Sequence, residues 1–253
     1  MLMQALGLVQ LWPAFWAGNT PRMALVLAVT AAFSVVGYLV RGVSRNGAIA
    51  GGAVCFVLFA CAGPGAFAAL GILFVVTWLA TRLGRARKQQ LGTAERREGR
   101  SASQVLANLA TAATCAVVYA VSRRPVFLVA FAASLAEVAA DTVSGECGQA
   151  FDQSARLITT FEVVPAGTDG GITLKGTAAG IAAALIISLT CYLTGLVDEY
   201  GALAVALAGS LGMVPDSVIG AVWERQGLLN NDAVNFLSTA SAAVLAIALI
   251  AFM

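Results

Sequence analysis

The sequence predicts an all-α protein, a polytopic integral membrane helical bundle of about seven to eight spans. Hydrophobic residues make up 59% of the 253 residues and charged residues only 11%, whereas soluble domains carry about 25% charged residues. Apolar stretches of about 20 residues recur between short polar breaks, and a helix of that length crosses the hydrocarbon core of a bilayer. The sequence lacks the alternation of apolar and polar residues that is typical of a membrane β-barrel. Helices are therefore the predicted spanning elements.

Residues 1–22 are expected to form a short span or an interfacial helix anchored by Trp12 and Trp16. Because Arg22 is the first charged residue, a cleavable signal peptide is not expected. The remaining residues, 23–253, are predicted to form a single membrane domain. Within it, apolar stretches predict spans at 23–40, 48–62, 65–82, 104–121, 125–147, 177–197, 200–220 and 233–253.

Composition argues against a nucleic-acid partner and against a zinc site. The net charge of +2 is small and dispersed, so nucleic acid is not expected as a partner, whereas membrane lipids are. The five cysteines lie singly in or beside apolar stretches and the chain has no histidine, so we predict buried hydrophobic cysteines and no zinc site. The sequence leaves the oligomeric state open, and a homo-oligomer is one of the alternatives.

The basic segment at 82–103 predicts the orientation of the chain in the membrane. Seven lysines and arginines there outnumber Glu95 and Glu98, so the positive-inside rule makes the segment cytoplasmic. Counting spans outward brings the glycine-rich loop at 148–176 to the same side, and only the Arg123-Arg124 pair disagrees. We therefore expect a multi-pass protein whose active face is cytoplasmic, where nucleotides are available.

Acidic residues lie on the fifth predicted span and at its end. Glu137 and Asp141 are four residues apart and share a helical face, and Glu146 follows. A carboxylate in mid-membrane costs roughly 2.5 to 3.5 kcal/mol, so this face needs partners or a polar cavity, and divalent cations would be one partner. The structural alternative is pairing with polar groups of neighbouring helices, such as Asn108 for Glu137.

The loop at 148–176 is rich in glycine where it approaches the next span. Such a turn can present successive N–H groups to an anion, and the N-terminus of the helix that follows favours negative charge, which makes phosphate a natural ligand. Lys175 would add a positive charge, although Lys-Gly-Thr is not the order of a Walker motif. A tight re-entrant turn without a ligand explains the glycines about as well. The glycines concerned are Gly167, Gly170, Gly171 and Gly176.

Two further polar groups lie near the ends of the last two spans. Asp216, followed by Ser217, is a candidate metal ligand or general base, and helix capping is the alternative. Before the last span, capping by Asn231 or Asp232 is favoured over a ligand role. The predicted topology brings these groups to the face that carries Arg100 and Glu146. Carboxylates, an anion cradle and basic residues are the parts of metal-assisted phosphoryl transfer, and a site embedded in lipid suggests a lipid-like acceptor.

Several short motifs, taken together, resemble a known membrane family from about Gly47 to the C-terminus. The principal string is Asp141-Thr142, Glu146, Gly148, Val164-Pro165, Gly167-Thr168-Asp169-Gly170-Gly171 and Gly176-Thr177. Supporting matches are Arg100 with Gln104, Val105 and Asn108, then Gly209-Ser210-Leu211, Asp216-Ser217, Gly220-Ala221, Asn231-Asp232 and Val234-Asn235-Phe236. They resemble the family that contains transmembrane protein nineteen and the plant and cyanobacterial phytyl-phosphate kinase of tocopherol synthesis. This family is also classified as a domain of unknown function.

The resemblance implies a membrane kinase, a phosphotransferase that converts a phytyl-like isoprenyl monophosphate to the diphosphate. The implied donor is a nucleoside triphosphate, with CTP favoured, and the implied cofactor is Mg²⁺. Asp141, Glu146 and Asp216 are the implied catalytic and metal-binding residues. One departure is Gly145, where family members often have serine before the glutamate. The implied nucleotide-binding and substrate-binding residues are Arg100, Asn108, Pro165, Gly167, Thr168, Asp169, Gly170, Gly171, Lys175, Gly176, Thr177, Ser217, Asn231 and Asn235.

Two other functions stay open at this point. A transporter or lipid-translocating protein is suggested by the intramembrane Glu137 and Asp141, which could relay protons. It would give substrate flux that depends on Glu137 and needs no nucleotide. A CTP-dependent cytidylyltransferase would instead release pyrophosphate where a kinase releases CDP.

Overall fold

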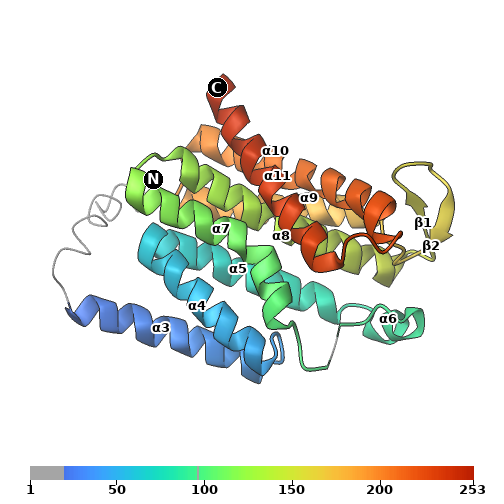
Figure 1. The fold of residues 1–253 in the computed structure, drawn as a ribbon, viewed down its shortest axis with the longest axis horizontal. Helices are drawn as coiled ribbons and strands as arrows, with labels where there is room; N and C mark the ends of the chain where they lie inside the picture. Colours follow the sequence, from blue (N-terminus) through green and yellow to red (C-terminus); the bar gives the residue numbers. More distant parts are fainter. Residues whose placement is uncertain (1–19, 96) are drawn as a thin grey trace.

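The computed structural model describes residues 20–95 and 97–253, which are almost entirely helical (Figure 1). The helices are α3 (Thr20–Leu39), α4 (Arg45–Ala62), α5 (Pro64–Arg82), α6 (Arg85–Leu91), α7 (Ala102–Ser122), α8 (Val126–Phe151), α9 (Leu174–Leu193), α10 (Glu199–Ile219), the π-helical turn η1 (Gly220–Glu224) and α11 (Asn231–Phe252). Three short strands, β1 (Ser154–Leu157), β2 (Val163–Pro165) and β3 (Gly171–Ile172), lie between α8 and α9. The expectation for 1–22 falls mostly outside the described residues.

Within residues 20–95 and 97–253, seven helices are long and apolar enough to cross a membrane, which confirms the predicted polytopic all-α bundle. They are α4, α5, α7, α8, α9, α10 continued by η1, and α11. Helix α3 contains a shorter apolar stretch, Met23–Leu39, where a span was expected at 23–40. Helix α4 begins at Arg45, before the predicted residue 48, because the Ser44 side chain accepts a hydrogen bond from the Gly47 N–H (3.1 Å) and caps the helix.

Helix α8 is the centre of the bundle. Every residue from Leu128 to Ala140 is buried, and the helix packs against α5, α7, α9, α10 and α11. Small residues allow these close approaches, which matter because packing drives helix association in lipid. A Cβ atom at Gly209 or at Gly212 of α10 would lie only 2.5 Å from Ala136 Cβ or Glu137 Cγ, respectively. These glycines therefore bring α10, with Asp216, against the acidic face of α8.

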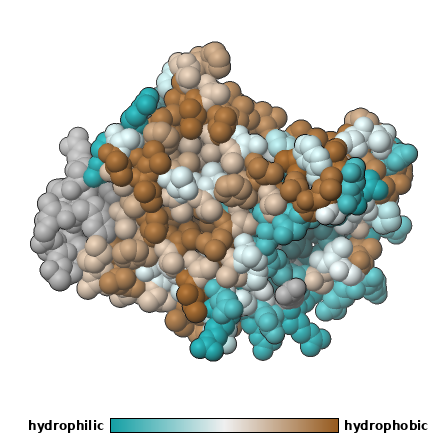
Figure 2. Space-filling view, viewed as in Figure 1, coloured by the Kyte–Doolittle hydropathy of each residue, from teal (hydrophilic) through white to brown (hydrophobic). Residues whose placement is uncertain are grey.

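One end of the bundle is polar. Successive membrane helices alternate in direction, so every second connection lies at the same end: residues 40–44, 83–101, 152–173 and 225–230. Hydrophilic residues gather there, on the side of α6, β1 and β2, whereas much of the rest of the visible face is hydrophobic (Figures 1 and 2). The loops expected on the active face thus lie together. Their location on the cytoplasmic side stays a prediction.

The predicted loop at 148–176 is shorter than expected and carries a small sheet. Helix α8 continues to Phe151 and α9 begins at Leu174, capped by the Thr173 side chain, which accepts a hydrogen bond from the Gly176 N–H (3.0 Å). Between the helices the strands form an antiparallel sheet in the order β2-β1-β3, with Arg156 of β1 paired to both neighbours. The sheet holds both ends of the glycine turn at 167–171.

Candidate functional site

A polar cavity of about 470 Å³ lies at the polar end of the bundle. Its walls come from α7, α8, α10, η1 and the first turns of α11, together with residues from 93–100 and 166–173. Segments far apart in the sequence therefore line the same cavity. The functional roles of their residues stay predictions. The predicted site residues that line it are Arg100, Asn108, Asp141, Glu146, Gly167, Thr168, Asp169, Gly170, Gly171, Asp216, Ser217, Asn231 and Asn235.

Four predicted site residues do not line the cavity. They are Pro165, Lys175, Gly176 and Thr177. Lys175 forms an ion pair with Asp152 (2.9 Å) and donates a hydrogen bond to the Phe151 carbonyl oxygen, and its side chain is 61% exposed. This contact holds the pKa of Asp152 below its usual value. The Lys175 ammonium group therefore lies outside the cavity and is engaged by Asp152 and Phe151.

Two carboxylates meet inside the cavity. Asp141 of α8 and Asp216 of α10 both line it, and their carboxyl groups lie within hydrogen-bonding distance of each other. Glu137 lies one turn deeper on α8 and is 1% exposed, and the Ser238 hydroxyl of α11 lies beside both Glu137 and Asp216. Glu137 Oε1 and Asp216 Oδ2 are buried with no hydrogen-bond partner among the described residues. Such atoms cost free energy unless a proton or a cation satisfies them.

Acidic groups outnumber basic ones on the cavity wall. Six carboxylates line it, and Arg100 is the one basic residue among the described lining residues. Phosphates would be repelled from this wall unless cations neutralise it. The carboxylates belong to Glu95, Asp141, Glu146, Asp169, Asp216 and Glu224.

Oxygen donors of this kind suit Mg²⁺. This ion commonly takes one or two carboxylates and completes its octahedral shell with waters and substrate phosphates. Over residues 20–95 and 97–253, no group of three acidic or cysteine side chains is arranged to hold a metal ion alone. The Asp141 and Asp216 pair, with its unsatisfied oxygen, therefore fits a cation that binds together with phosphate.

Glu146, a predicted metal ligand, forms an ion pair with Lys88 of α6. The Lys88 side chain is 1% exposed, and its ammonium group also donates hydrogen bonds to the Ala80 and Thr81 carbonyl oxygens at the end of α5 (3.3 and 2.8 Å). The pair therefore ties α5, α6 and α8 together and neutralises Glu146. A structural role explains Glu146 without a metal, so Asp141 and Asp216 are better placed as ligands.

The turn at 167–171 faces the cavity with its backbone. Gly167 and Gly170 have φ angles of 90° and 74°, a conformation that suits glycine. The N–H groups of Gly167, Asp169 and Gly170 form no hydrogen bond with any described residue, so they are available to an anion. Desolvation raises the pKa of the Asp169 carboxyl group, and the nearby Arg225 partly opposes this rise.

Glu224 also lines the cavity, although the sequence reasoning did not single it out. Pro215 lies inside α10 and removes one backbone donor, and α10 then passes into the π-helical turn that ends at Glu224. A π turn inserts an extra residue and so changes the direction of the side chains that follow it. It brings Glu224 beside Asn231 and Asp169. A π turn leaves no reliable sequence signal, although Glu224 lies only four residues beyond the predicted end of its span, residue 220.

The two predicted alternatives that rest on helix capping are wrong, whereas Glu137 does lie beside a polar group of a neighbouring helix. Asp216 lies inside α10 and faces Asp141, so it does not cap a helix. Helix α11 is capped by Asn230, whose Oδ1 accepts a hydrogen bond from the Ala233 N–H (2.9 Å), and not by Asn231 or Asp232. The polar group beside Glu137 is the Ser238 hydroxyl of α11 and not Asn108, which donates its side-chain hydrogen bond to the Gln104 carbonyl oxygen (2.8 Å).

Comparison with known proteins gives matches over most of the chain. The family described as integral membrane protein DUF92 matches residues 28–243. Protein VTE6, chloroplastic, of Arabidopsis thaliana is 29% identical over 257 residues, which covers 98% of this chain and 75% of that protein.

Two microbial proteins are similar to the chain at somewhat higher identity. An uncharacterized membrane protein of Methanocaldococcus jannaschii is 34% identical over 203 residues, covering 79% of this chain and 82% of its own. One from Synechocystis is 33% identical over 196 residues, covering 76% of each chain. No solved structure matches the chain. The family match includes every segment that lines the polar cavity. The chain therefore belongs to the DUF92 family of integral membrane proteins.

Proposed function

We propose that the protein is a membrane-embedded kinase that converts a phytyl-like isoprenyl monophosphate to the diphosphate, using a nucleoside triphosphate, with CTP favoured, and Mg²⁺. One observation carries the proposal. Residues of motifs that resemble those of the phytyl-phosphate kinase family line one cavity, in which paired carboxylates face a turn with free N–H groups. Similarity to Protein VTE6 over 98% of the chain supports a phosphotransferase.

In this proposal Asp141 and Asp216 would hold Mg²⁺, which would neutralise the negative charge on the phosphates of the donor. The turn at 167–171 would bind phosphate oxygens through its N–H groups. Arg100 donates a hydrogen bond to Thr142 Oγ1 (3.3 Å) at the cavity wall, where its guanidinium could orient the acceptor phosphate. These residues supply positioning and charge neutralisation, which dominate the catalysis of phosphoryl transfer.

The reaction moves one phosphoryl group. An oxygen atom of the acceptor monophosphate attacks the γ-phosphorus, and the bond from that phosphorus to the oxygen that bridges the β- and γ-phosphates breaks. The nucleoside diphosphate leaves with the bond electrons and the isoprenyl diphosphate is formed. The acceptor oxygen already carries negative charge, so the step requires no deprotonation by the protein. The polar end of the bundle would face the cytoplasm, in agreement with the seven basic residues of 82–103.

The direct test is an assay with purified protein in lipid nanodiscs, CTP or ATP, Mg²⁺, and phytyl or geranylgeranyl phosphate. We expect isoprenyl diphosphate and nucleoside diphosphate in equal amounts, and no product without Mg²⁺. Absence of diphosphate across a broad panel of acceptors would count against the proposal. Release of pyrophosphate instead of CDP would identify a cytidylyltransferase.

Replacing Gly170 by alanine is expected to weaken the binding of CTP with Mg²⁺ about tenfold in calorimetric titration. A Cβ atom there would lie 2.6 Å from the backbone nitrogen of Ala221, so the turn must move away from η1, and overpacking of this kind costs about 1 to 3 kcal/mol. Gly227→Ala is the matched control, because Gly227 has a similar φ of 71° but no atom within 4 Å. Equal losses in both variants would contradict the role of the turn.

A second candidate, a transporter or lipid-translocating protein, is favoured by Glu137, which is buried with an unpartnered oxygen atom. In that case proteoliposomes would give substrate flux without nucleotide, and Glu137→Gln would abolish the flux. Nucleotide-independent flux without any formation of diphosphate would favour this candidate over the kinase.

A further inference from the structure

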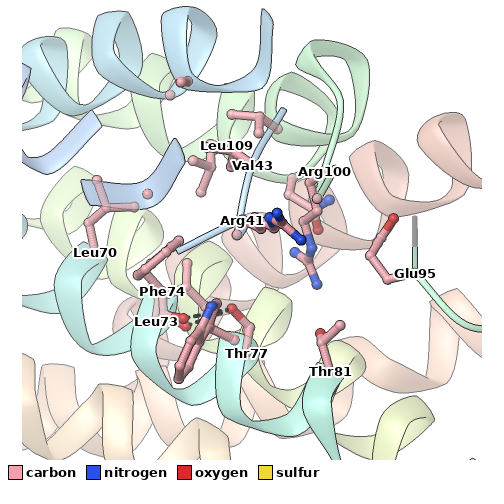
Figure 3. A pocket seen from close by; sticks show the side chains of 18 of the residues that line it. Arg41, Val43, Leu70, Leu73, Phe74, Thr77, Thr81, Glu95, Arg100 and Leu109 are labelled. Carbon is pink, nitrogen blue, oxygen red and sulfur yellow. Dashed lines mark hydrogen bonds between the residues drawn. The ribbon is translucent and has the colours of Figure 1, made fainter. Parts of the chain in front are cut away.

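A second, mostly apolar cavity of about 120 Å³ adjoins the polar one. It lies among α3, α4, α5, α7 and α8, and Glu95, Arg100 and Asn108 line both cavities. Leu70, Leu73 and Phe74 of α5 form part of its apolar wall (Figure 3). The apolar cavity therefore meets the polar cavity at the positively charged Arg100, together with Glu95 and Asn108.

Arginines concentrate at this junction. Arg41, Arg82, Arg85 and Arg100 line the apolar cavity, against the single carboxylate of Glu95 among its described lining residues. The guanidinium of Arg82 is engaged, since it donates to the Val40 carbonyl oxygen (2.6 Å) and lies 3.9 Å from the centre of the Trp78 ring. Arg41 and Arg100 form no ion pair with any described carboxylate, and their side chains extend toward the same part of the cavity (Figure 3).

The backbone holds Arg41 and Arg100 at this place. The Ser44 N–H donates to the Arg100 carbonyl oxygen (2.9 Å), and the Arg100 N–H donates to the Gly42 carbonyl oxygen (3.1 Å). Gly99 permits the contact, because a Cβ atom there would lie 2.6 Å from the Gly42 backbone. Two guanidinium groups held near each other repel unless an anion lies between them. The arrangement thus suits an anionic group attached to an apolar one.

We infer that the apolar cavity is the acceptor site, which holds the first part of the isoprenyl chain while Arg41 and Arg100 bind the monophosphate at the entrance to the polar cavity. The inference rests on the proposed function, since it names where the acceptor binds. It adds Arg41 as a phosphate-binding residue and α3, α4 and α5 as the elements that contact the chain. The phosphate would then face the donor phosphates across Arg100 and Asn108.

The size of the cavity limits what it contains. An apolar cavity of about 150 Å³ holds one benzene molecule, so a cavity of about 120 Å³ accommodates roughly one five-carbon isoprene unit. The rest of a long chain would extend into the membrane. The site therefore recognises an isoprenyl phosphate by its phosphate and first unit and tolerates different chain lengths.

The first test fills the cavity. Gly51 of α4 lines it, and a Cβ atom at Gly51 would meet only Val105, at 3.9 Å, so Gly51→Leu extends into the space without a backbone clash. We expect at least a tenfold rise in the dissociation constant of radiolabelled geranylgeranyl monophosphate in nanodiscs, with unchanged binding of CTP and Mg²⁺. Gly71→Leu is the matched control, since Gly71 is also helical, has no atom within 4 Å of its Cβ position and does not line the cavity.

The second test removes a guanidinium. Arg41 has a φ of 55°, which asparagine tolerates, so Arg41→Asn preserves the backbone. We expect it to abolish the preference for geranylgeranyl monophosphate over geranylgeraniol. Arg123→Asn is the control, because Arg123 has a φ of 58° and lies exposed at the end of α7, away from the polar end.

These binding measurements separate the acceptor site from the proposed activity. The wild-type protein could make no diphosphate while Gly51→Leu and Arg41→Asn still bind geranylgeranyl monophosphate more weakly than their controls. That result would support the acceptor site and contradict the kinase activity. If the variants bind the lipid as well as their controls, the site is wrong whatever the activity. Equal competition by phosphatidate would also overturn it, because the cavity would then accept a general lipid phosphate.

Discussion

Replacing Asp141 or Asp216 by asparagine is expected to lower the rate of phosphoryl transfer at saturating substrate by at least about 10²-fold. Asparagine keeps the shape of each side chain but removes the charge that would hold Mg²⁺ against the phosphates. Because the two carboxyl groups lie within hydrogen-bonding distance of each other, they would hold one cation in the proposed site, and the double variant should lose little more than either single one. The measurement is the rate of diphosphate formation at several Mg²⁺ concentrations.

Asp198→Asn is the matched control for these variants. Asp198 caps α10 at the opposite end of the bundle, where its Oδ1 accepts a hydrogen bond from the Gly201 N–H (2.8 Å), and asparagine caps helices equally well. This variant should keep its activity. Full activity in Asp141→Asn and Asp216→Asn would rule out the proposed metal-binding pair.

Lys88→Met is expected to lower the free energy of unfolding by about 3 kcal/mol, at the lower end of the cost of breaking a buried ion pair. Methionine fills a similar volume, but the change leaves Glu146 charged beside the cavity and the Ala80 and Thr81 carbonyl oxygens without their donor. Denaturant-induced unfolding in detergent micelles measures the effect. Lys175→Met, which breaks the largely exposed pair with Asp152, should change stability little.

A second substitution distinguishes the charge effect from simple loss of packing. The double variant Lys88→Met and Glu146→Leu contains no unpaired charge at this place, so it should regain much of the free energy of unfolding that Lys88→Met loses. If the double variant is as unstable as Lys88→Met alone, Glu146 is not what makes that variant unstable. The pair would then matter only through the carbonyl contacts of Lys88.

The fold could be predicted because lipid imposes simple rules on sequence. Apolar length predicted the spans to within a few residues, since a membrane helix must satisfy its own backbone groups. Boundaries moved where a side chain capped a helix, as Ser44 does for α4. The extension of α8 to Phe151 and the sheet within 152–173 depend on contacts between distant residues, which hydropathy does not record.

The candidate site could be predicted in part, because topology sends alternate connections to one end. Asp141, Asp216 and the turn at 167–171 meet there, as their positions near the ends of spans indicated. Glu224 was missed because a π turn redirects it, and Lys88 because it was one of seven basic residues in a segment used only to predict the orientation of the chain. Lys175 lies beside the glycines in the sequence but does not line their cavity, because its ammonium group pairs with Asp152.

The most direct test of the central claim, that the polar cavity binds phosphates through a cation, is isothermal titration of CTP into the protein with and without Mg²⁺. We predict binding with Mg²⁺, none with EDTA, and none to the variant with both Asp141→Asn and Asp216→Asn. Binding of equal affinity without Mg²⁺, or to that double variant, would contradict the account.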